Sequence, residues 1–143
     1  RRDLARVIRQ VRPDRVVCPT PERNYQRIAG SHPDHRAVGS AALDAVYPDA
    51  RNPRAYRDLL TEGFEPHKVK EVWVGGLDQP DVIIDAAPFM DKKMQAILCH
   101  ASQFQKPDME PGTPEKWIRD RMRQTGERHG LEYAEGFRRL ETG

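Results

Sequence analysis

The stretch "DRVVCPTPERNYQRIAGSHPDHRAVGSAALDAV", residues 14–46, decides the fold, because it predicts a strand, a loop and a helix in that order. The apolar run that ends near Cys18 lies between turn signals, which is typical of a buried strand. Residues 19–31 are polar and rich in turn-forming residues, whereas residues 33–47 carry small residues at helical spacing. Ligands of open α/β sheets bind at the carboxyl ends of strands, so this loop is the first place to look for a site.

The remainder of the chain continues the alternation of helices and strands. Apolar periodicity predicts helices over residues 3–11, 53–62, 88–104 and 114–129, with a proline-rich break over 106–114. Strands are expected in "VKEVWVGG" (69–76) and "DVIIDAA" (81–87), with a strand or extended segment in "LEYAEGFRRLE" (131–141). This order predicts an α/β fold with a mostly parallel sheet. Three strands are few for such a sheet, and the chain opens inside a helical pattern, so we expect a fragment of a domain.

Composition narrows the class of protein. The 143 residues correspond to one domain, with 37% apolar and 32% charged residues and a net charge of +2. Arginines are scattered among acidic residues, which argues against nucleic acid as the main partner, and no apolar run reaches the length of a membrane span. Cys18 and Cys99 both lie in apolar contexts, so we expect buried thiols and a cytoplasmic protein.

The segment "GSHPDHRAVG", residues 30–39, has two interpretations that the spacing leaves open. In the first, His32, Pro33 and Asp34 begin a helix, with His32 near the N-cap. In the second, one histidine binds a metal, the other transfers a proton, and Asp34 orients an imidazole ring. The three other histidines, His67, His100 and His129, are scattered and do not complete a three-ligand site.

Three segments together indicate a family. "RPDRVVCPTPERN" (12–24), "SHPDHRAVGSAALDAV" (31–46) and "DVIIDAAPFMDKKMQAILCHASQ" (81–103) resemble, in this order, the C-terminal half of the LmbE-like (PIG-L type) zinc-dependent N-acetylglucosaminyl deacetylases. The closing "YAEGF" (133–137) is similar to the end of these proteins. The resemblance implies a Rossmann-like, mostly parallel sheet flanked by helices, with residues 1–143 as the C-terminal part of a single domain whose N-terminal portion is absent.

The resemblance also implies roles for the histidine segment. His35 would be a zinc ligand, His32 would protonate or stabilise the tetrahedral intermediate, and Asp34 would be the partner of His32. The first motif of the family, His-Pro-Asp-Asp, does not occur in these 143 residues. Two ligands and the general base would therefore come from the missing N-terminal half. Zinc is the usual metal of the family, although mixed histidine and carboxylate ligands also accept other divalent metals.

The implied function is hydrolysis of an acetyl or other acyl group from the amide nitrogen of an amino sugar or related conjugate. Arg23, Tyr25 and Arg27 are candidates for binding the sugar, and His100 and Gln103 match the helix motif of the family. Three alternatives stay open: an inactive fragment, a metal-free binding module, and an amidase acting on a thiol conjugate or a glycopeptide. Expected partners are a small amino-sugar-type substrate and the missing half, without nucleic acid or membrane, and a homo-oligomer is left open.

Overall fold

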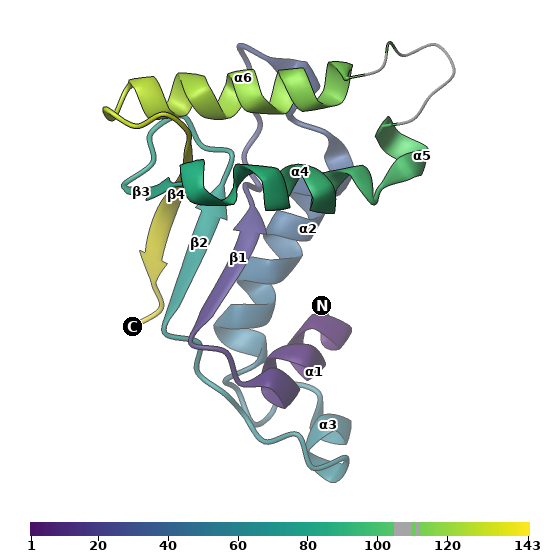
Figure 1. The fold of residues 1–143 in the computed structure, drawn as a ribbon. Helices are drawn as coiled ribbons and strands as arrows, with labels where there is room; N and C mark the ends of the chain where they lie inside the picture. The colour runs from purple at the N-terminus through teal and green to yellow at the C-terminus, as the bar shows by residue number, and fades with distance from the viewer. Residues whose placement is uncertain (105–109, 111) are drawn as a thin grey trace. The chain divides into compact units, whose positions relative to one another are not determined.

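The computed structural model describes residues 1–104, 110 and 112–143, and it has a mixed α/β fold with a four-stranded sheet flanked by helices (Figure 1). The strand order is β1-β2-β4-β3, where the strands are β1 (Arg15–Pro19), β2 (Glu71–Gly75), β3 (Val82–Asp85) and β4 (Ala134–Glu141). The chain forms two compact units, residues 1–81 with 137–143 (unit 1) and residues 82–136 (unit 2). The predicted α/β class is confirmed and the closing segment is a strand, but the sheet was expected to be mostly parallel and combines a parallel pairing (β1–β2) with an antiparallel one (β2–β4).

Unit 1 contains the strand, loop and helix that residues 14–46 predict. Its helical elements are α1 (Arg2–Val11), η1 (Ile28–Gly30), α2 (Pro33–Asp44), η2 (Ala45–Asp49) and α3 (Arg57–Thr61). β1 pairs in parallel with β2, and β2 pairs antiparallel with residues 137–141 of β4. Small and branched side chains of α1, α2, η2, the strands and the residues next to them share one core: Ile8, Cys18, Ala42, Ala45, Val46, Ala50, Val69, Val72 and Val74.

The helix that we expected over residues 33–47 is regular only to Asp44. Tyr47 has an extended backbone, with φ −140° and ψ 119°, because proline at position 48 disfavours the helical conformation of the residue before it. The short helix expected over residues 53–62 is also shorter than predicted, since α3 covers only Arg57–Thr61. In both cases a proline or a turn makes the helix shorter than the sequence pattern predicts.

A buried polar network holds the end of η2 against α1. Asp49 accepts hydrogen bonds from Arg1 Nη2 at 2.8 Å and from the Tyr56 hydroxyl at 3.0 Å, and the Arg1 guanidinium holds the pKa of this carboxyl below its usual value. The side chain of Arg9 is 2% exposed and donates to four backbone carbonyls, those of Asp49, Ala50, Asn52 and Ala55. The Arg9 guanidinium therefore joins the end of η2 to the turns that follow it through their backbone carbonyls.

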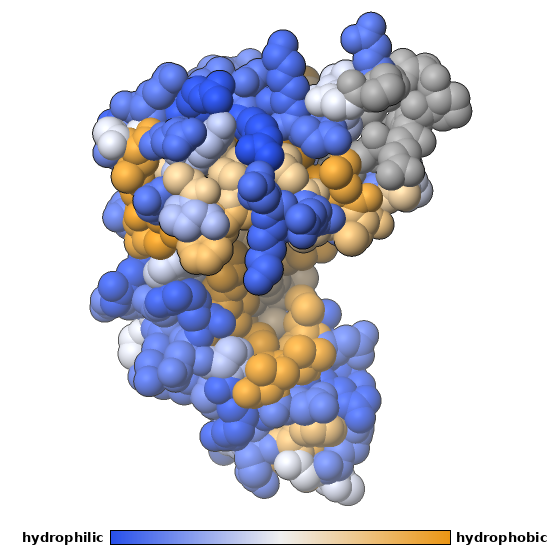
Figure 2. All heavy atoms as spheres, viewed as in Figure 1, coloured by the Kyte–Doolittle hydropathy of each residue, from blue (hydrophilic) through white to orange (hydrophobic). Residues whose placement is uncertain are grey.

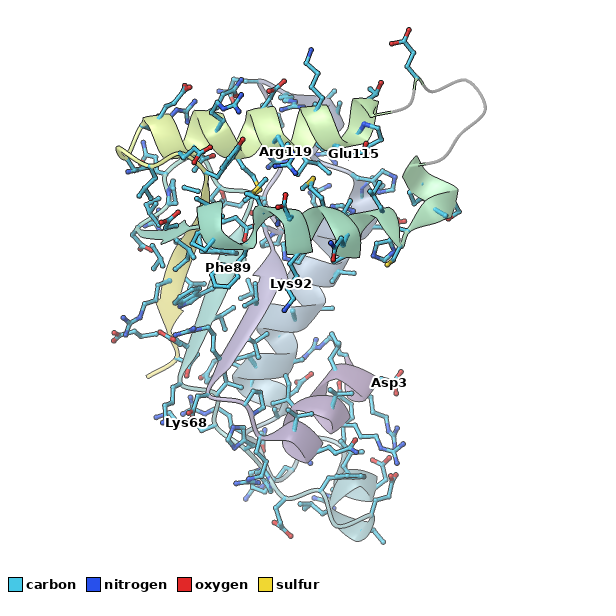
Figure 3. All side chains as sticks on the ribbon, in the orientation of Figure 1. Asp3, Lys68, Phe89, Lys92, Glu115 and Arg119 are labelled. Carbon is cyan, nitrogen blue, oxygen red and sulfur yellow. The ribbon has the colours of Figure 1, made fainter. Side chains whose placement is uncertain are left out.

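Besides β3 and the first residues of β4, unit 2 contains the helical elements η3 (Ala87–Phe89), α4 (Met90–Leu98), α5 (Ala101–Phe104) and α6 (Thr113–Glu127). Arg119 of α6, which is labelled in Figure 3, forms an ion pair with Asp91 of α4 at 3.0 Å. The core of this unit consists of Ala86, Met90, Met94, Ile118, Met122 and Tyr133. The helix expected over residues 88–104 is broken at residues 99–100, and most of the proline-rich segment lies outside the described residues.

The two cysteines differ in burial. Cys18 is buried in the core of unit 1, and burial raises the pKa of its thiol. Cys99 is exposed, so the expectation of a buried thiol was wrong there. Cys99 is the C-cap residue of α4. Its Sγ donates to the Gln95 carbonyl at 3.3 Å and does not lie in the core. Within the described ranges, no helix has both the length and the apolar character needed to cross a membrane.

Candidate functional site

The histidine segment forms the start of α2, as the capping interpretation predicted. His32 is the N-cap residue and Pro33 occupies the first turn. The His32 Nδ1 accepts a hydrogen bond from the backbone N–H of Asp34 at 3.3 Å. An imidazole whose Nδ1 is an acceptor carries its hydrogen on Nε2 when the ring is neutral. The cap therefore leaves the Nε2–H of His32 free to donate a hydrogen bond to a ligand.

The second histidine lies beside the first. The ring centroids of His32 and His35 are 5.8 Å apart, and the ring planes are tilted by 56°. Both residues are exposed, and the side chain of His32 is 62% exposed. The carboxylate of Asp34 lies 3.8 Å from His32 Nδ1, which is beyond hydrogen-bond distance. In this structure the backbone of Asp34, rather than its carboxylate, orients the imidazole of His32.

The metal interpretation can be tested against the donors that are present. A catalytic zinc site takes three protein ligands, from His, Cys, Asp or Glu, and keeps one position open. Among the described residues, no three such side chains converge on a point where an ion could be held. The exposed imidazole of His35 is a ligand of the right type, so this segment can provide one ligand of such a site and not the complete set.

The loop between β1 and α2 is folded onto the start of α2. Ser31 is 7% exposed, and its Oγ accepts the backbone N–H of Asn24 at 2.7 Å. The Oδ1 of Asn24 in turn accepts the backbone N–H groups of Gln26 and Arg27 at 3.0 and 2.9 Å. Arg36 of α2 donates from Nε to the Pro21 carbonyl at 3.3 Å. These bonds fix the loop next to His32.

This loop forms one wall of a cavity of about 630 Å³ in unit 1. The other walls come from the loop that follows β2 and from three elements beneath it; the cavity is lined by residues 20–26 and 76–79 together with Leu43, Val74, Arg138 and Leu140. Two of the sugar-binding candidates, Arg23 and Tyr25, lie in this lining, and Tyr25 is 85% exposed. Arg27, the third candidate, is exposed and is not part of the lining.

The two candidates of the second unit stay predictions. His100 follows α4 and Gln103 belongs to α5, and both are exposed. The Nε2 of Gln103 donates to the Ser102 hydroxyl at 3.4 Å, and its backbone N–H donates to the His100 carbonyl at 2.9 Å. Lys93, from the same motif, forms an ion pair with Glu135. These contacts belong to unit 2, and they give His100 and Gln103 local roles within it.

Sequence reasoning missed three residues of this region. Ser31 and Arg36 fix the loop, and Arg138 lines the cavity. The period of two in the closing strand was a usable signal for Arg138, because it places Arg138 and Leu140 on one face and Arg139 on the other. No comparable signal exists for Ser31, because its partner Asn24 is brought close by the irregular path of the loop.

Comparison with known proteins agrees with this architecture. No family model matches the chain. It is 33% identical over 138 residues to a diacetylchitobiose deacetylase from Thermococcus kodakarensis, covering 96% of this chain and 49% of the relative. It is 32% identical over 97 residues to a probable N-acetyl-alpha-D-glucosaminyl L-malate deacetylase 2 from Bacillus cereus, covering 68% of this chain and 38% of the relative.

A solved structure is similar over almost the whole chain. It is the N,N'-diacetylchitobiose deacetylase from Pyrococcus horikoshii in complex with an inhibitor, with a TM-score of 0.83 and 32% identity. The match covers 98% of this chain and 50% of that chain. The chain thus spans about half the length of the curated relatives it matches, and these homologues carry the activity that the LmbE-like resemblance implied.

Proposed function

We propose that this chain is part of an LmbE-like, metal-dependent hydrolase that removes an acetyl or related acyl group from the amide nitrogen of an amino sugar or its conjugate. The observation that carries the proposal is the pair of adjacent imidazoles at the start of α2. The pair stands in a chain that is 33% identical to a deacetylase and has a TM-score of 0.83 with another. A cytoplasmic location and the assignment of all 143 residues to one domain are parts of the same proposal.

His35 is assigned as a metal ligand, since its exposed imidazole is free of intramolecular hydrogen bonds among the described residues. When bound, a zinc ion would polarise the carbonyl of the substrate amide and lower the pKa of a water molecule. His32 donates a hydrogen bond from Nε2 to the oxygen that becomes negative during hydrolysis, and the departing amine takes up the proton that the general base has removed from the attacking water. The N–H of Asp34 supports this role because it keeps the acceptor at Nδ1 and thus the proton at Nε2.

The remaining ligands and the general base are proposed to come from a segment outside these 143 residues. Two surfaces of unit 1 support this. β1 lies at an edge of the sheet within the described chain, and its Val17 is 59% exposed. The exposed side chains of α1 add an apolar area, which Figure 2 shows over this helix: Leu4 is 38%, Val7 53% and Val11 66% exposed. Packing of a further segment there buries apolar surface and completes the sheet.

The test uses the natural protein, including any sequence that flanks these residues. We expect about one zinc ion per chain. We expect His35→Ala to lose this ion and to hydrolyse an N-acetylglucosamine substrate more than about 100-fold more slowly. Such a decrease exceeds the loss that is typical of residues that only orient metal ligands. His129→Ala is the control, because this exposed histidine lies in unit 2. Unchanged zinc content and unchanged activity in His35→Ala would exclude the role assigned to His35, whereas a natural protein that carries no zinc at stoichiometric supply and shows no hydrolysis would exclude the proposed function and favour a metal-free binding module.

A further inference from the structure

Arg36 lies where α2 meets the loop that follows β1. It comes directly after His35, near the start of α2, and it is half-buried. Its backbone N–H donates to the carbonyl of His32, the N-cap residue, at 3.2 Å. Its side chain donates from Nε to the carbonyl of Pro21 at 3.3 Å. Arg36 therefore connects the beginning of the helix to a residue of the loop.

The turn that contains Pro21 is itself bonded to the sheet. β1 ends at Pro19 and β2 ends at Gly75, and the two strands are parallel partners that point toward the start of α2 (Figure 1). The backbone N–H of Thr20 donates to the Gly75 carbonyl at 3.0 Å. A run of hydrogen bonds thus leads from the end of β2 through this turn to the side chain of Arg36.

The middle and the start of α2 are held in different ways. Gly39 is buried, and a Cβ at this position would overlap the Pro19 carbonyl oxygen, so the middle of the helix packs closely against the turn. Residues 32–35 are exposed, so packing contributes little to the start of the helix. The hydrogen bond from Arg36 supplies a polar contact with the same turn at the point nearest the histidines.

The position of the helix start matters for a metal ligand. Sites of open α/β sheets form at the carboxyl ends of strands, so further ligands of the proposed site have to meet His35 there. A functional site requires its groups to be held within about 0.5 Å of the productive geometry. Loss of a group that only orients a ligand typically costs about 10–100-fold in metal affinity.

We propose that Arg36 is a positioning residue of the metal site, whose hydrogen bond from Nε to the Pro21 carbonyl holds the His35 imidazole at a fixed place relative to the carboxyl ends of β1 and β2. The inference rests on the proposed function, because it concerns the metal ligand of the same site. The role belongs to the Nε–H and not to the charge, since the Nη groups form no hydrogen bond or ion pair within the part of the chain that the structure describes.

Two substitutions in the natural protein separate the hydrogen bond from the charge. Glutamine carries its amide nitrogen on Cδ, as arginine carries Nε, so Arg36→Gln keeps a donor for the Pro21 carbonyl and loses the charge. Arg36→Met keeps an apolar stem and has no donor. We expect Arg36→Met to bind zinc about 10-fold or more weakly in competition with a chelator, and Arg36→Gln to stay within about 3-fold of the original protein. Arg54→Gln, at an exposed arginine of unit 1, is the control and should leave the zinc affinity unchanged.

The zinc affinity is measured where circular dichroism shows each variant to be folded. A purely structural role of Arg36 would lower the free energy of unfolding and leave the zinc affinity of the folded protein unchanged. If Arg36→Met does not fold, Arg36→Lys takes its place, because lysine keeps the charge and lacks a donor on Cδ. We expect Arg36→Lys to bind zinc more weakly than Arg36→Gln.

The outcomes distinguish this inference from the proposed function. If the natural protein binds zinc and hydrolyses an N-acetylglucosamine substrate, and the variant without the donor keeps the original zinc affinity, the inference is wrong while the proposed function stands. Equal losses in Arg36→Met and Arg36→Gln would assign the effect to the charge and would also overturn the inference. A natural protein with neither zinc nor hydrolysis would overturn the proposed function, and the inference with it.

Discussion

At the scale of single residues, Ser31 is neither a helix cap nor a metal ligand, and its role is to hold the loop between β1 and α2 in place. Its hydroxyl is buried and accepts the Asn24 N–H at 2.7 Å, so it holds the loop that carries Arg23 and Tyr25 next to His32. A buried N–H that loses its acceptor costs about 1–3 kcal/mol. The loop should therefore be the first part of unit 1 to loosen when this hydroxyl is removed.

We expect Ser31→Ala to raise KM more than it lowers kcat, and to speed hydrogen exchange of the Asn24 amide by about 10-fold or more. Hydrogen exchange followed by NMR, together with steady-state kinetics on the natural protein, measures both effects. Ser40→Ala, the same substitution at an exposed position of α2, is the control. Unchanged exchange at Asn24 would contradict the positioning role.

The limits of prediction at this scale follow from the distance over which residues interact. His32 as N-cap and Pro33 in the first turn were predictable, because capping depends on neighbours in sequence. The exposure of Cys99 was not, because it depends on where α4 ends. The face of β4 on which Arg138 lies could be predicted from the alternation of side chains along a strand. The cavity that Arg138 lines could not, because its walls are loops whose paths follow no simple sequence pattern.

Among the elements, α2 depends on one glycine. Gly39 is buried where α2 crosses the end of β1, and a Cβ at this position would overlap the Pro19 carbonyl oxygen and lie 2.9 Å from the Pro21 nitrogen. Both obstacles are backbone atoms, so a side-chain rotation cannot relieve the overlap. The close approach is needed because the loop that follows Pro19 turns back over α2.

Gly39→Ala should lower the free energy of unfolding by about 1–3 kcal/mol, despite the better helix propensity of alanine. Val38→Ala, at a position that is 54% exposed on the same helix, should change it by less than about 0.5 kcal/mol. Denaturant unfolding monitored by circular dichroism measures both. A stabilised Gly39→Ala would show that α2 does not approach the loop as closely as described.

Element boundaries were predictable where the pattern and the breakers agree. α1, β1 and the start of α2 lie where apolar periodicity and the prolines place them. The single helix expected over residues 88–104 divides into α4 and α5, although "ILCHASQF" contains neither glycine nor proline to signal the break. Apolar spacing alone therefore does not report this break.

For the molecule as a whole, acid stability should depend on the network around Asp49. The Arg1 guanidinium and the Tyr56 hydroxyl lower the pKa of this carboxyl. A carboxyl whose pKa is lower in the folded state adds stability above its unfolded pKa of about 3.9, and this stability is lost as the pH falls through its folded pKa.

We expect Asp49→Asn to lower the melting temperature at pH 7, and the difference from the original chain to shrink as the pH is reduced below about 4. Glu65→Gln is the control, because this exposed glutamate has no ion pair among the described residues. Thermal melts at a series of pH values make the comparison. A difference that stays constant between pH 7 and pH 3 would be inconsistent with the assigned charge interaction.

The exposed edge of β1 also bears on how this chain behaves in concentrated solution. The backbone N–H and C=O groups on the free edge of a strand can pair with a strand of another molecule, which is a common route to aggregation. β1 has only five residues, begins with Arg15 and ends with Pro19, which lacks an N–H. Charged residues and prolines of this kind limit pairing with unrelated chains. The edge is therefore better suited to pairing with a segment of the same polypeptide than with an unrelated protein chain in solution.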